Sequence, residues 1–434
     1  MEVYNLLTDS DLESELKSLL SDEYMFAFFK SFCNAIRSRI WRLKRGKSAR
    51  YNAEDFLKVF FFAEVTGRSI DDASELLNSY YLSKKKGRRK IFADGRKKRE
   101  VPHQTDVNGF LRPIGMEKVR KILRECLDSQ LQESLERDII SKQVDVIIDF
   151  HEKGYYGKRD DKMIKGTTRI KGTKKMRHYL AFSILSKGKH LFAGLEHVAK
   201  GQHKTPIINK FLNYLLNMGF KIRYVMFDRE FYEAELIKKI KTMGSNIIMP
   251  AKLYKKPKQF IKAYLQGKGN RVRRYKISSA PGKKCRFSQV VYLIATAKKG
   301  YTLLGIKRDL KRGNLTLKNA MERVFIIMTT GKPKGKDGSW ASRILRFYRK
   351  RWFIETIFSD LNRIAPSWKS KHDNVRYLDM LMRMLLYNSW KINRGLLKKS
   401  RNKKYGKRAW KLINNQDLLI KCFLTSEKKL IMIT

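Results

Sequence analysis

The sequence predicts an α/β protein, with a mixed β-sheet core between helical regions at the two ends of the chain. Residues 144–250 alternate short runs of β-branched residues with stretches that carry apolar residues at helical spacing. The residues before about 140 and after about 340 carry the helical pattern alone. With 42% hydrophobic residues, the chain can bury a sizeable core, which argues against intrinsic disorder.

The N-terminal part is expected to consist of helices and short connections. Residues 23–43 carry apolar and aromatic side chains at helical spacing, and a second helix is expected over 53–65. A Thr-Gly pair ends that helix, and Ser69 and Asp72 make a capping-box-like start for the next one. Helix, glycine-containing turn and helix is the outline of a helix-turn-helix, which reads DNA, but any two packed helices give the same pattern. Both interpretations stay open.

A basic segment separates these helices from the next one. Residues 83–100 are dense in Lys and Arg and poor in apolar residues, so an exposed loop is expected there. Residues 104–139 resume helical periodicity, with Thr105 as the expected N-cap.

The character of the chain changes at residue 144, where a β-branched run predicts a buried strand. Two further strands are expected on either side of a turn at 186–189. In chain order, the expected elements are strands at 144–150, 179–185 and 190–198, a helix at 205–217, a strand at 222–228, a helix at 231–243 and a strand at 246–249. This order, β-β-β-α-β-α-β, is the layout of a ribonuclease-H-like core, with mixed strand pairing and helices packed on the sheet.

Residues 251–330 are expected to form a strand-rich insertion between the last core strand and the final core helix. Its expected strands lie at 290–295, 301–306 and 324–328, with basic loops between them. A helix that begins near Ser342 is expected to run past Glu355, and further helices to fill 374–396. The expected parts of the chain are a helical region at 1–140, the α/β core with its insertion at 141–395, and a basic helical tail at 396–434.

The chain is strongly basic, with 96 Lys and Arg residues against 41 Asp and Glu residues and a formal net charge of +55. Such a protein attracts polyanions through counterion release, and nucleic acid is the usual polyanion in a cell. A single basic run, such as Lys84-Lys85-Lys86, is also common on a solvated surface. The whole-chain excess favours nucleic-acid binding, and residues 1–140 are expected to be a DNA-binding region.

The cysteine spacing and the hydropathy of the sequence indicate the cellular compartment in which the protein is expected. Four cysteines, at positions 33, 126, 285 and 422, are too scattered for a metal cluster or a disulfide framework and fit a reducing compartment. The N-terminus lacks the layout of a signal peptide. No apolar stretch approaches the roughly 20 residues of a membrane helix. A cytoplasmic, nucleoid-associated protein without a membrane partner is expected.

Two carboxylates are expected where core strands end. Asp149 follows the apolar run of its strand, and Asp228 ends its own strand in the same way. Open α/β sheets bind ligands at the edge where such residues lie. An Asp at this position also serves as a turn residue or helix N-cap, which fits Asp228 because a helix is expected from 231. Two such acids in one core favour a shared site.

A third carboxylate, Glu355, lies four residues after Arg351 and seven after Tyr348, so the three share one helix face. An ordinary surface ion pair between Arg351 and Glu355 accounts for part of this spacing. Three carboxylates without Cys or clustered His suit hard, oxygen-ligated ions, Mg²⁺ or Mn²⁺. Two such ions about 4 Å apart can activate a water or a 3′-hydroxyl and stabilise the leaving oxygen in phosphoryl transfer.

Three motifs of the core stand out by their residues and spacing. They are Ile147-Ile148-Asp149-Phe150-His151 with Gly154-Tyr155-Tyr156-Gly157; Phe227-Asp228-Arg229-Glu230-Phe231-Tyr232; and Tyr348, Arg351 and Glu355. Together they resemble insertion-sequence transposases with a DDE active site and the YREK signature. The resemblance runs over 144–395 and, more loosely, over the helical N-terminus. The segment Tyr387-Asn388-Ser389-Trp390 also looks like the family's closing segment.

The resemblance implies roles for particular residues. Asp149, Asp228 and Glu355 would be the catalytic residues and the ligands of two Mg²⁺ or Mn²⁺ ions. Tyr348 and Arg351 would contact the DNA backbone near the scissile bond.

Further contacts to DNA are expected outside these five residues. Arg229, in the second motif, is expected to bind DNA as well. The final Lys of the signature is replaced by Asn362. Either the neighbouring Arg363 supplies the cation or the contacts to the DNA end are weaker.

These expectations describe a transposase that binds the terminal inverted repeats of its own mobile element as a homodimer. It would cut the end phosphodiester and direct the 3′-hydroxyl at target DNA. A metal-dependent nuclease of the same fold without strand transfer fits the same acids, because both reactions use the same metals on different nucleophiles. A non-catalytic DNA-binding descendant is a third interpretation, which the intact set of acids disfavours.

Overall fold

The structure, a computed structural model, divides the chain into two units. One comprises Met1–Ile140, Leu191–Gly194 and Phe358–Thr434, and the other Ser141–His190 and Leu195–Ile357. The described residues are 51, 55–56, 59–60, 62–63, 68–84, 99–158, 162–170, 172–279, 287–333, 337–363, 370 and 372–399. The expected helix at 23–43, most of the basic loop at 83–100 and the tail from residue 400 lie outside them. Of the expected helix at 53–65, the described residues are helical.

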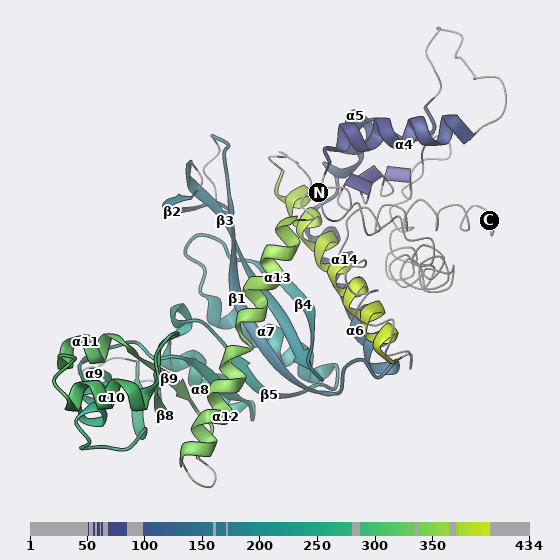
Figure 1. Ribbon diagram of the computed structural model, residues 1–434. Helices are drawn as coiled ribbons and strands as arrows, with labels where there is room; N and C mark the ends of the chain where they lie inside the picture. The colour runs from purple at the N-terminus through teal and green to yellow at the C-terminus, as the bar shows by residue number, and fades with distance from the viewer. Residues whose placement is uncertain are drawn as a thin grey trace, which may run out of the picture. The chain divides into compact units, whose positions relative to one another are not determined.

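A mixed sheet of nine strands forms in the described part of the chain (Figure 1). Its order is β2-β3-β1-β5-β6-β9-β8-β7, and β4 also pairs with β3. The strands are β1 Gln143–Gly154, β2 Lys165–Ile170, β3 Thr173–Ser186, β4 Lys189–His197, β5 Lys221–Met226, β6 Asn246–Pro250, β7 Val272–Ser278, β8 Ser288–Ala297 and β9 Val324–Thr329.

The core of this sheet has the predicted ribonuclease-H-like layout. β1 pairs antiparallel with β3 and parallel with β5, and β5 pairs parallel with β6. Both faces of β1 are covered, which is why its β-branched run is buried throughout. The expected turn after β3 is present, with Lys187 and Gly188 both at positive φ, as a two-residue hairpin turn requires.

Strand β2 is an element that the sequence pattern does not predict. Lys165–Ile170 contains Lys, Gly, two Thr and Arg before its single apolar residue, so it lacks the alternation of a half-buried strand. It forms because β3 is long and offers its N-terminal half as a partner.

Helices lie on both faces of the core sheet. Figure 1 shows α12 and the start of α13 crossing in front of the strands and α7 behind them. The bounds are α7 Lys204–Asn217, α8 Ala234–Thr242, α12 Asp337–Arg349 and α13 Trp352–Arg363. The prediction of one helix from Ser342 past Glu355 is wrong in one respect: the helix starts earlier and is interrupted at Lys350 and Arg351.

The insertion at 251–330 combines strands with helices. β7, β8 and β9 extend the main sheet beyond β6. The helices α9 Lys255–Leu265, α10 Leu303–Lys311 and α11 Leu317–Glu322 contact one another beside them. The expected strand at 301–306 is wrong, since α10 begins there. Thr302 caps this helix by accepting a hydrogen bond from the N–H of Gly305, and a short apolar run alone does not separate helix from strand.

The other unit is helical where it is described. Its helices are α4 Ile70–Lys84, α5 Gln104–Leu111, α6 Met116–Glu136 and α14 Asp373–Lys399. The Ser69 cap is confirmed, because Ser69 Oγ accepts a hydrogen bond from the N–H of Asp72 at 3.0 Å. None of the helices in the described ranges is long and apolar enough to cross a membrane.

The expected helix at 104–139 is two helices, and its cap differs from the prediction. The chain leaves the helix at Arg112 and re-enters it after Pro113 and Gly115, because proline has no N–H to donate. The N-cap of α5 is His103, not Thr105: its ring nitrogen accepts from the N–H of Thr105, and its own N–H donates to Asp106.

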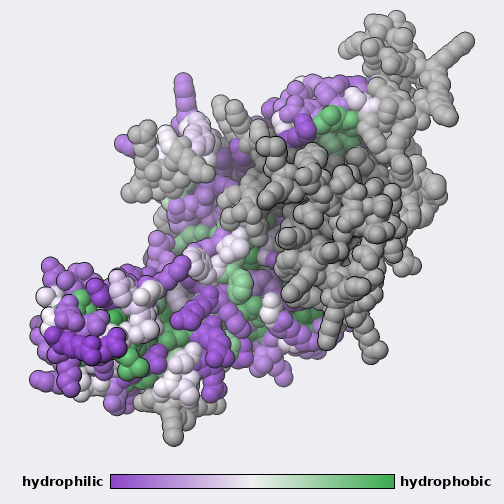
Figure 2. All heavy atoms as spheres, viewed as in Figure 1, coloured by the Kyte–Doolittle hydropathy of each residue, from purple (hydrophilic) through white to green (hydrophobic). Residues whose placement is uncertain are grey.

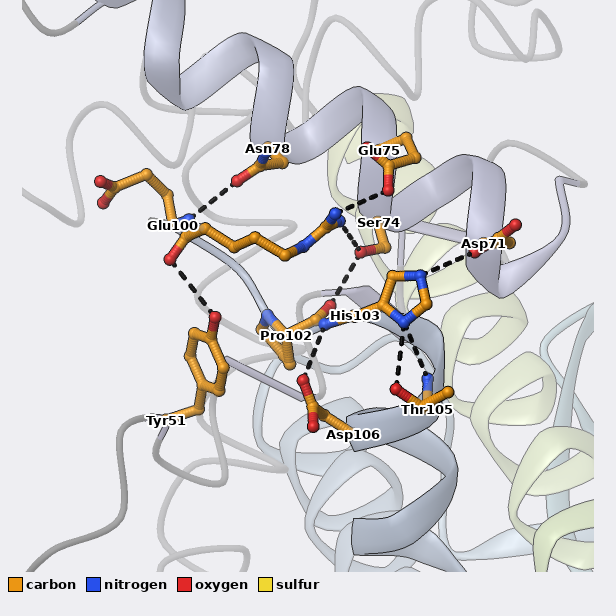
Figure 3. Close-up of polar contacts among 11 residues, drawn as sticks. Tyr51, Asp71, Ser74, Glu75, Asn78, Glu100, Pro102, His103, Thr105 and Asp106 are labelled. Carbon is orange, nitrogen blue, oxygen red and sulfur yellow. Dashed lines mark hydrogen bonds and ion pairs between the residues drawn. The ribbon is translucent and has the colours of Figure 1, made fainter. Parts of the chain in front are cut away.

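The segment before α5 is tied to α4 by polar contacts (Figure 3). Ser74 donates to the carbonyl of Pro102 at 2.8 Å, and Asn78 accepts from the N–H of Glu100 at 2.8 Å. The Arg99 guanidinium donates to Glu75 at 2.7 Å. These bonds hold residues 99–102 against α4.

The long helix α14 contacts Phe192 of β4, which belongs to the same unit. Asn388 is fully buried, and its amide both donates to the carbonyl of Phe192 at 2.9 Å and accepts from the N–H of Phe192 at 2.8 Å. Phe192 lies in β4, so this side chain satisfies backbone groups that an edge strand would otherwise leave open. A second buried contact joins Gln130 of α6 to the carbonyl of Leu385 at 3.0 Å.

Candidate active site

Asp149 and Asp228 occupy equivalent positions on neighbouring parallel strands. The last pair of the β1–β5 ladder is Ile147 with Met226, and each Asp follows two residues later. The prediction that the strand ends at Asp149 is wrong: β1 continues to Gly154, with Asp149 paired to Ala181 of β3. What ends near Asp149 is the pairing with β5, because β5 stops at Met226.

Asp228 does not cap a helix with its side chain. It precedes a short 3₁₀ turn, Arg229–Phe231, without a side-chain capping bond, and Glu233 occupies the N-cap of α8. Asp228 thus occupies the N-cap position of this turn, but its carboxylate makes no capping bond there. Its half-buried carboxylate is left for the site.

Arg351 joins Asp149 to Glu355. Its Nη1 lies 2.9 Å from Asp149 Oδ2, and its Nη2 lies 2.6 Å from Glu355 Oε1. The expected ion pair between Arg351 and Glu355 is thus present, but the guanidinium also reaches an acid some 200 positions away on another element. A surface ion pair alone does not account for that, because the Arg351 side chain is only 15% exposed.

The interruption between α12 and α13 places Arg351 at a tight turn. The N–H of Arg351 donates to the carbonyl of Tyr348, and the carbonyl of Arg351 accepts from the N–H of Ile354. Both bonds span three residues and close tighter turns than those of an α-helix. Tyr348 remains beside the guanidinium, with its ring centre 5.8 Å from the Arg351 Cζ atom.

Electrostatic effects act among these residues. The pKa of Asp149 is raised to about 6, chiefly by burial and to a smaller extent by the charges of Asp228 and Glu355, while Arg351 opposes the shift. Burial raises the pKa of Tyr348 to about 12; Arg351 lowers it, and Asp228 and Asp149 raise it. A cation beside Asp149 favours its charged form.

Two further residues, Arg229 and Arg363, are predicted to contact DNA. Arg229 directly follows Asp228, and its side chain is exposed. Arg363 is the last residue of α13, and its side chain, like that of Asn362, lies outside the described residues. Phe231 is fully buried and stacks on Phe150 with ring centres 4.7 Å apart, so it belongs to the core.

The acids fit a divalent cation by charge and donor type. Within the described residues, no group of three His, Cys, Asp or Glu side chains is close enough to hold a metal ion in this arrangement. Asp149 and Glu355 nonetheless already share one cation, the Arg351 guanidinium. Carboxylate oxygens are the ligands that Mg²⁺ and Mn²⁺ prefer.

A second polar cluster, which sequence reasoning missed, involves the residues that follow Asp149 in β1. His178 lies opposite Glu152 in the β1–β3 register, and its Nδ1 is 3.1 Å from the Lys165 ammonium of β2. Phe150 packs on the His178 ring at 4.1 Å between centres. The cluster could not be found without β2, the strand that the pattern does not predict.

His178 should make stability depend on pH. Burial, with further effects of Lys165, His197 and Lys204, lowers the pKa of His178 from 6.5 to about 4. Between these values the unfolded chain binds a proton that the folded chain does not, so stability falls as pH falls from 6.5 to 4. In His178→Phe, this part of the pH dependence should disappear. The difference in unfolding free energy between the two proteins, measured in urea at several pH values, should change across that window; a constant difference would contradict the assignment.

The model of the transposase DDE domain matches residues 146–389, a span that begins just before Asp149 and includes Glu355. No curated protein matches the chain. Among solved structures, the chain is similar to a piggyBac transposase in a synaptic complex with hairpin DNA, determined by cryo-EM. The two are 14% identical, the match covers 96% of this chain and 80% of that one, and the TM-score is 0.48. Because the family model matches more than half of the sequence, the chain belongs to the DDE-domain transposases.

Proposed function

We propose that this chain is an insertion-sequence transposase of the YREK-signature group, which cuts the ends of its mobile element and joins them to target DNA. The observation that carries the proposal is the contact of Arg351 with both Asp149 and Glu355, beside Tyr348. Asp228 follows β5 at the position that matches Asp149 in the neighbouring β1. Carboxylates placed in this way suit a site that holds two metal ions for phosphoryl transfer.

Each residue has a distinct role in this proposal. Asp149, Asp228 and Glu355 would hold two divalent ions, Mg²⁺ or Mn²⁺. When bound, such ions activate the attacking hydroxyl and stabilise the leaving oxygen. Arg351 carries a fixed planar charge that matches a phosphate group, and Tyr348 is held protonated by its raised pKa, so its hydroxyl can donate a hydrogen bond.

The insertion supplies a broad basic surface for DNA beyond the site. Residues 251–323 contain two acids, Asp309 and Glu322, among many Lys and Arg residues. Figure 2 shows a mostly hydrophilic face over α9, α10 and α11. Its exposed cations include Lys255, Lys256, Lys258, Lys262, Lys268, Arg308, Lys311, Arg312 and Lys318. Such a surface suits the DNA backbone, since phosphate contacts add affinity without needing sequence.

The helical N-terminal region is proposed to recognise the terminal inverted repeats, with two copies of the chain holding two ends. The DNA that flanks the gene should therefore carry short inverted repeats bracketed by a direct duplication. These repeats also provide the DNA for the test of function.

Strand joining separates a transposase from a nuclease of the same fold. Duplexes that carry a repeat with a pre-cleaved 3′-hydroxyl end should be joined to a plasmid in the presence of Mg²⁺, and the products should be visible on a gel. Cleavage of intact ends without joining would favour the nuclease. If no DNA is cut and no divalent ion is bound, the non-catalytic interpretation would replace the proposal.

A further inference from the structure

Arg351 already neutralises the acids that are proposed to bind metal. Its two terminal nitrogens contact two different carboxylates, at 2.9 Å on Asp149 and 2.6 Å on Glu355. The guanidinium is 15% exposed, and the Asp149 side chain 16% exposed, so solvent screens this contact weakly. The Arg351–Asp149 contact is therefore largely shielded from solvent, whereas Glu355 joins it from the exposed side, with its side chain 44% exposed.

A metal ion and this guanidinium compete for the same oxygen atoms. The second Asp149 oxygen, Oδ1, accepts a hydrogen bond from the N–H of Phe150 at 2.9 Å, so both oxygens of Asp149 are engaged. The guanidinium bridges Asp149 and Glu355, so a divalent ion that bridges the same two side chains needs the space and the negative charge that Arg351 now occupies. Conversely, removing Arg351 without a replacement cation leaves Asp149 and Glu355 without the positive charge that now lies between them.

Phosphate is the chemistry suited to draw Arg351 away. A phosphodiester offers the same planar fork of acceptors as a carboxylate, and the guanidinium binds it by two parallel hydrogen bonds. Arg351 lies in the turn between α12 and α13, and its long side chain can change partner by rotation about its own bonds.

We propose that Arg351 is an internal counter-ion that keeps divalent ions out of the site until a DNA phosphate takes over the guanidinium. This inference rests on the proposed function, because it needs Asp149 and Glu355 to be metal ligands. It assigns Arg351 a positioning role in addition to its DNA contact: metal entry and DNA binding are coupled through one side chain.

The test measures Mn²⁺ binding to the full chain without DNA, from the electron paramagnetic resonance signal of free Mn²⁺. Arg351→Met should bind Mn²⁺ at least about tenfold more tightly than the wild type, because the competing charge is gone. Arg351→Lys keeps the charge and should stay near the wild type. Arg351→Gln, which keeps a polar side chain, replaces the Met variant if that variant does not fold.

A matched control separates competition from the loss of general positive charge. Arg349 is exposed at the end of α12, two residues before Arg351. Arg349→Met makes the same charge change two residues away and should leave the Mn²⁺ affinity unchanged. If Arg349→Met tightens binding as much as Arg351→Met, long-range charge explains the effect and the proposal is wrong.

The two possible failures are distinguishable. If wild type and Arg351→Met bind Mn²⁺ equally, and Asp149→Asn abolishes binding in both, the metal site stands and the counter-ion role falls. If Asp149→Asn changes nothing in either background, the ion binds elsewhere and the proposed function itself is in error.

The proposed transfer of Arg351 to a DNA phosphate is tested by measuring Mn²⁺ binding in the presence of DNA. The ratio of the Mn²⁺ affinities of Arg351→Met and the wild type should fall toward one when a duplex oligonucleotide is present at saturation. Mn²⁺ binding by the DNA alone is measured and subtracted. An unchanged ratio would contradict the exchange with phosphate.

Discussion

Replacing Asp228 with Ala should lower Mg²⁺-dependent cleavage of element-end DNA on the order of a thousandfold or more. Asp228 follows β5 at the position that matches Asp149 in β1, and its charge raises the pKa of both Asp149 and Tyr348. Its side chain makes no helix cap that its removal would break. The loss should therefore appear in the rate of nicking, measured on a labelled duplex, with little change in thermal unfolding.

A second carboxylate provides the control for this substitution. Asp309 lies in α10 of the insertion, half-buried beside Arg308, and takes no part in the site. Asp309→Ala should cleave at the wild-type rate. Retained cleavage in Asp228→Ala, with an unchanged dependence on Mg²⁺, would remove Asp228 from the site.

Replacing Asn388 with Leu should destabilise the protein by about 3 kcal/mol. Leu fills a similar volume but cannot satisfy the N–H and carbonyl of Phe192, which bond the Asn388 amide at 2.8 and 2.9 Å. Each buried backbone group left without a partner costs about 1–3 kcal/mol. Asn388 is fully buried, so water cannot replace the lost bonds. The free energy of unfolding in urea measures the effect.

An exposed asparagine on a helix gives the comparison for Asn388. Asn213 lies in α7 with its side chain exposed, and Asn213→Leu should change the free energy of unfolding by less than about 0.5 kcal/mol. Equal effects of the two substitutions would mean that the amide of Asn388 does not hold β4 in the way described.

The core could be predicted from sequence because its elements carry strong local patterns. Strand β1 is a continuous β-branched run, and both β1 and β5 lead into an Asp, so the strands and their acids were found together. The order of strands and helices then restricted the topology, and the resulting ribonuclease-H-like layout is confirmed.

Other features depend on contacts between distant parts of the chain, which local patterns do not contain. Strand β2 is polar and is formed by its pairing with β3. The residues expected to form a strand at 301–306 begin a helix, because Thr302 caps its N-terminus and the short apolar run fits either structure. The contact of Arg351 with Asp149 needs the turn between α12 and α13, and helical spacing predicted only its contact with Glu355.

The central claim is that Asp149, Asp228 and Glu355 form one metal-dependent site, and metal rescue tests it most directly. A thiolate binds Mn²⁺ better than it binds Mg²⁺, because it is a softer ligand than a carboxylate. Cleavage by Asp149→Cys, Asp228→Cys and Glu355→Cys should therefore be lost in Mg²⁺ and recover in Mn²⁺, while the matching Ala variants stay inactive in both. Cysteine variants that cleave equally in the two metals, or that Mn²⁺ restores no better than the Ala variants, would contradict direct metal binding by these residues.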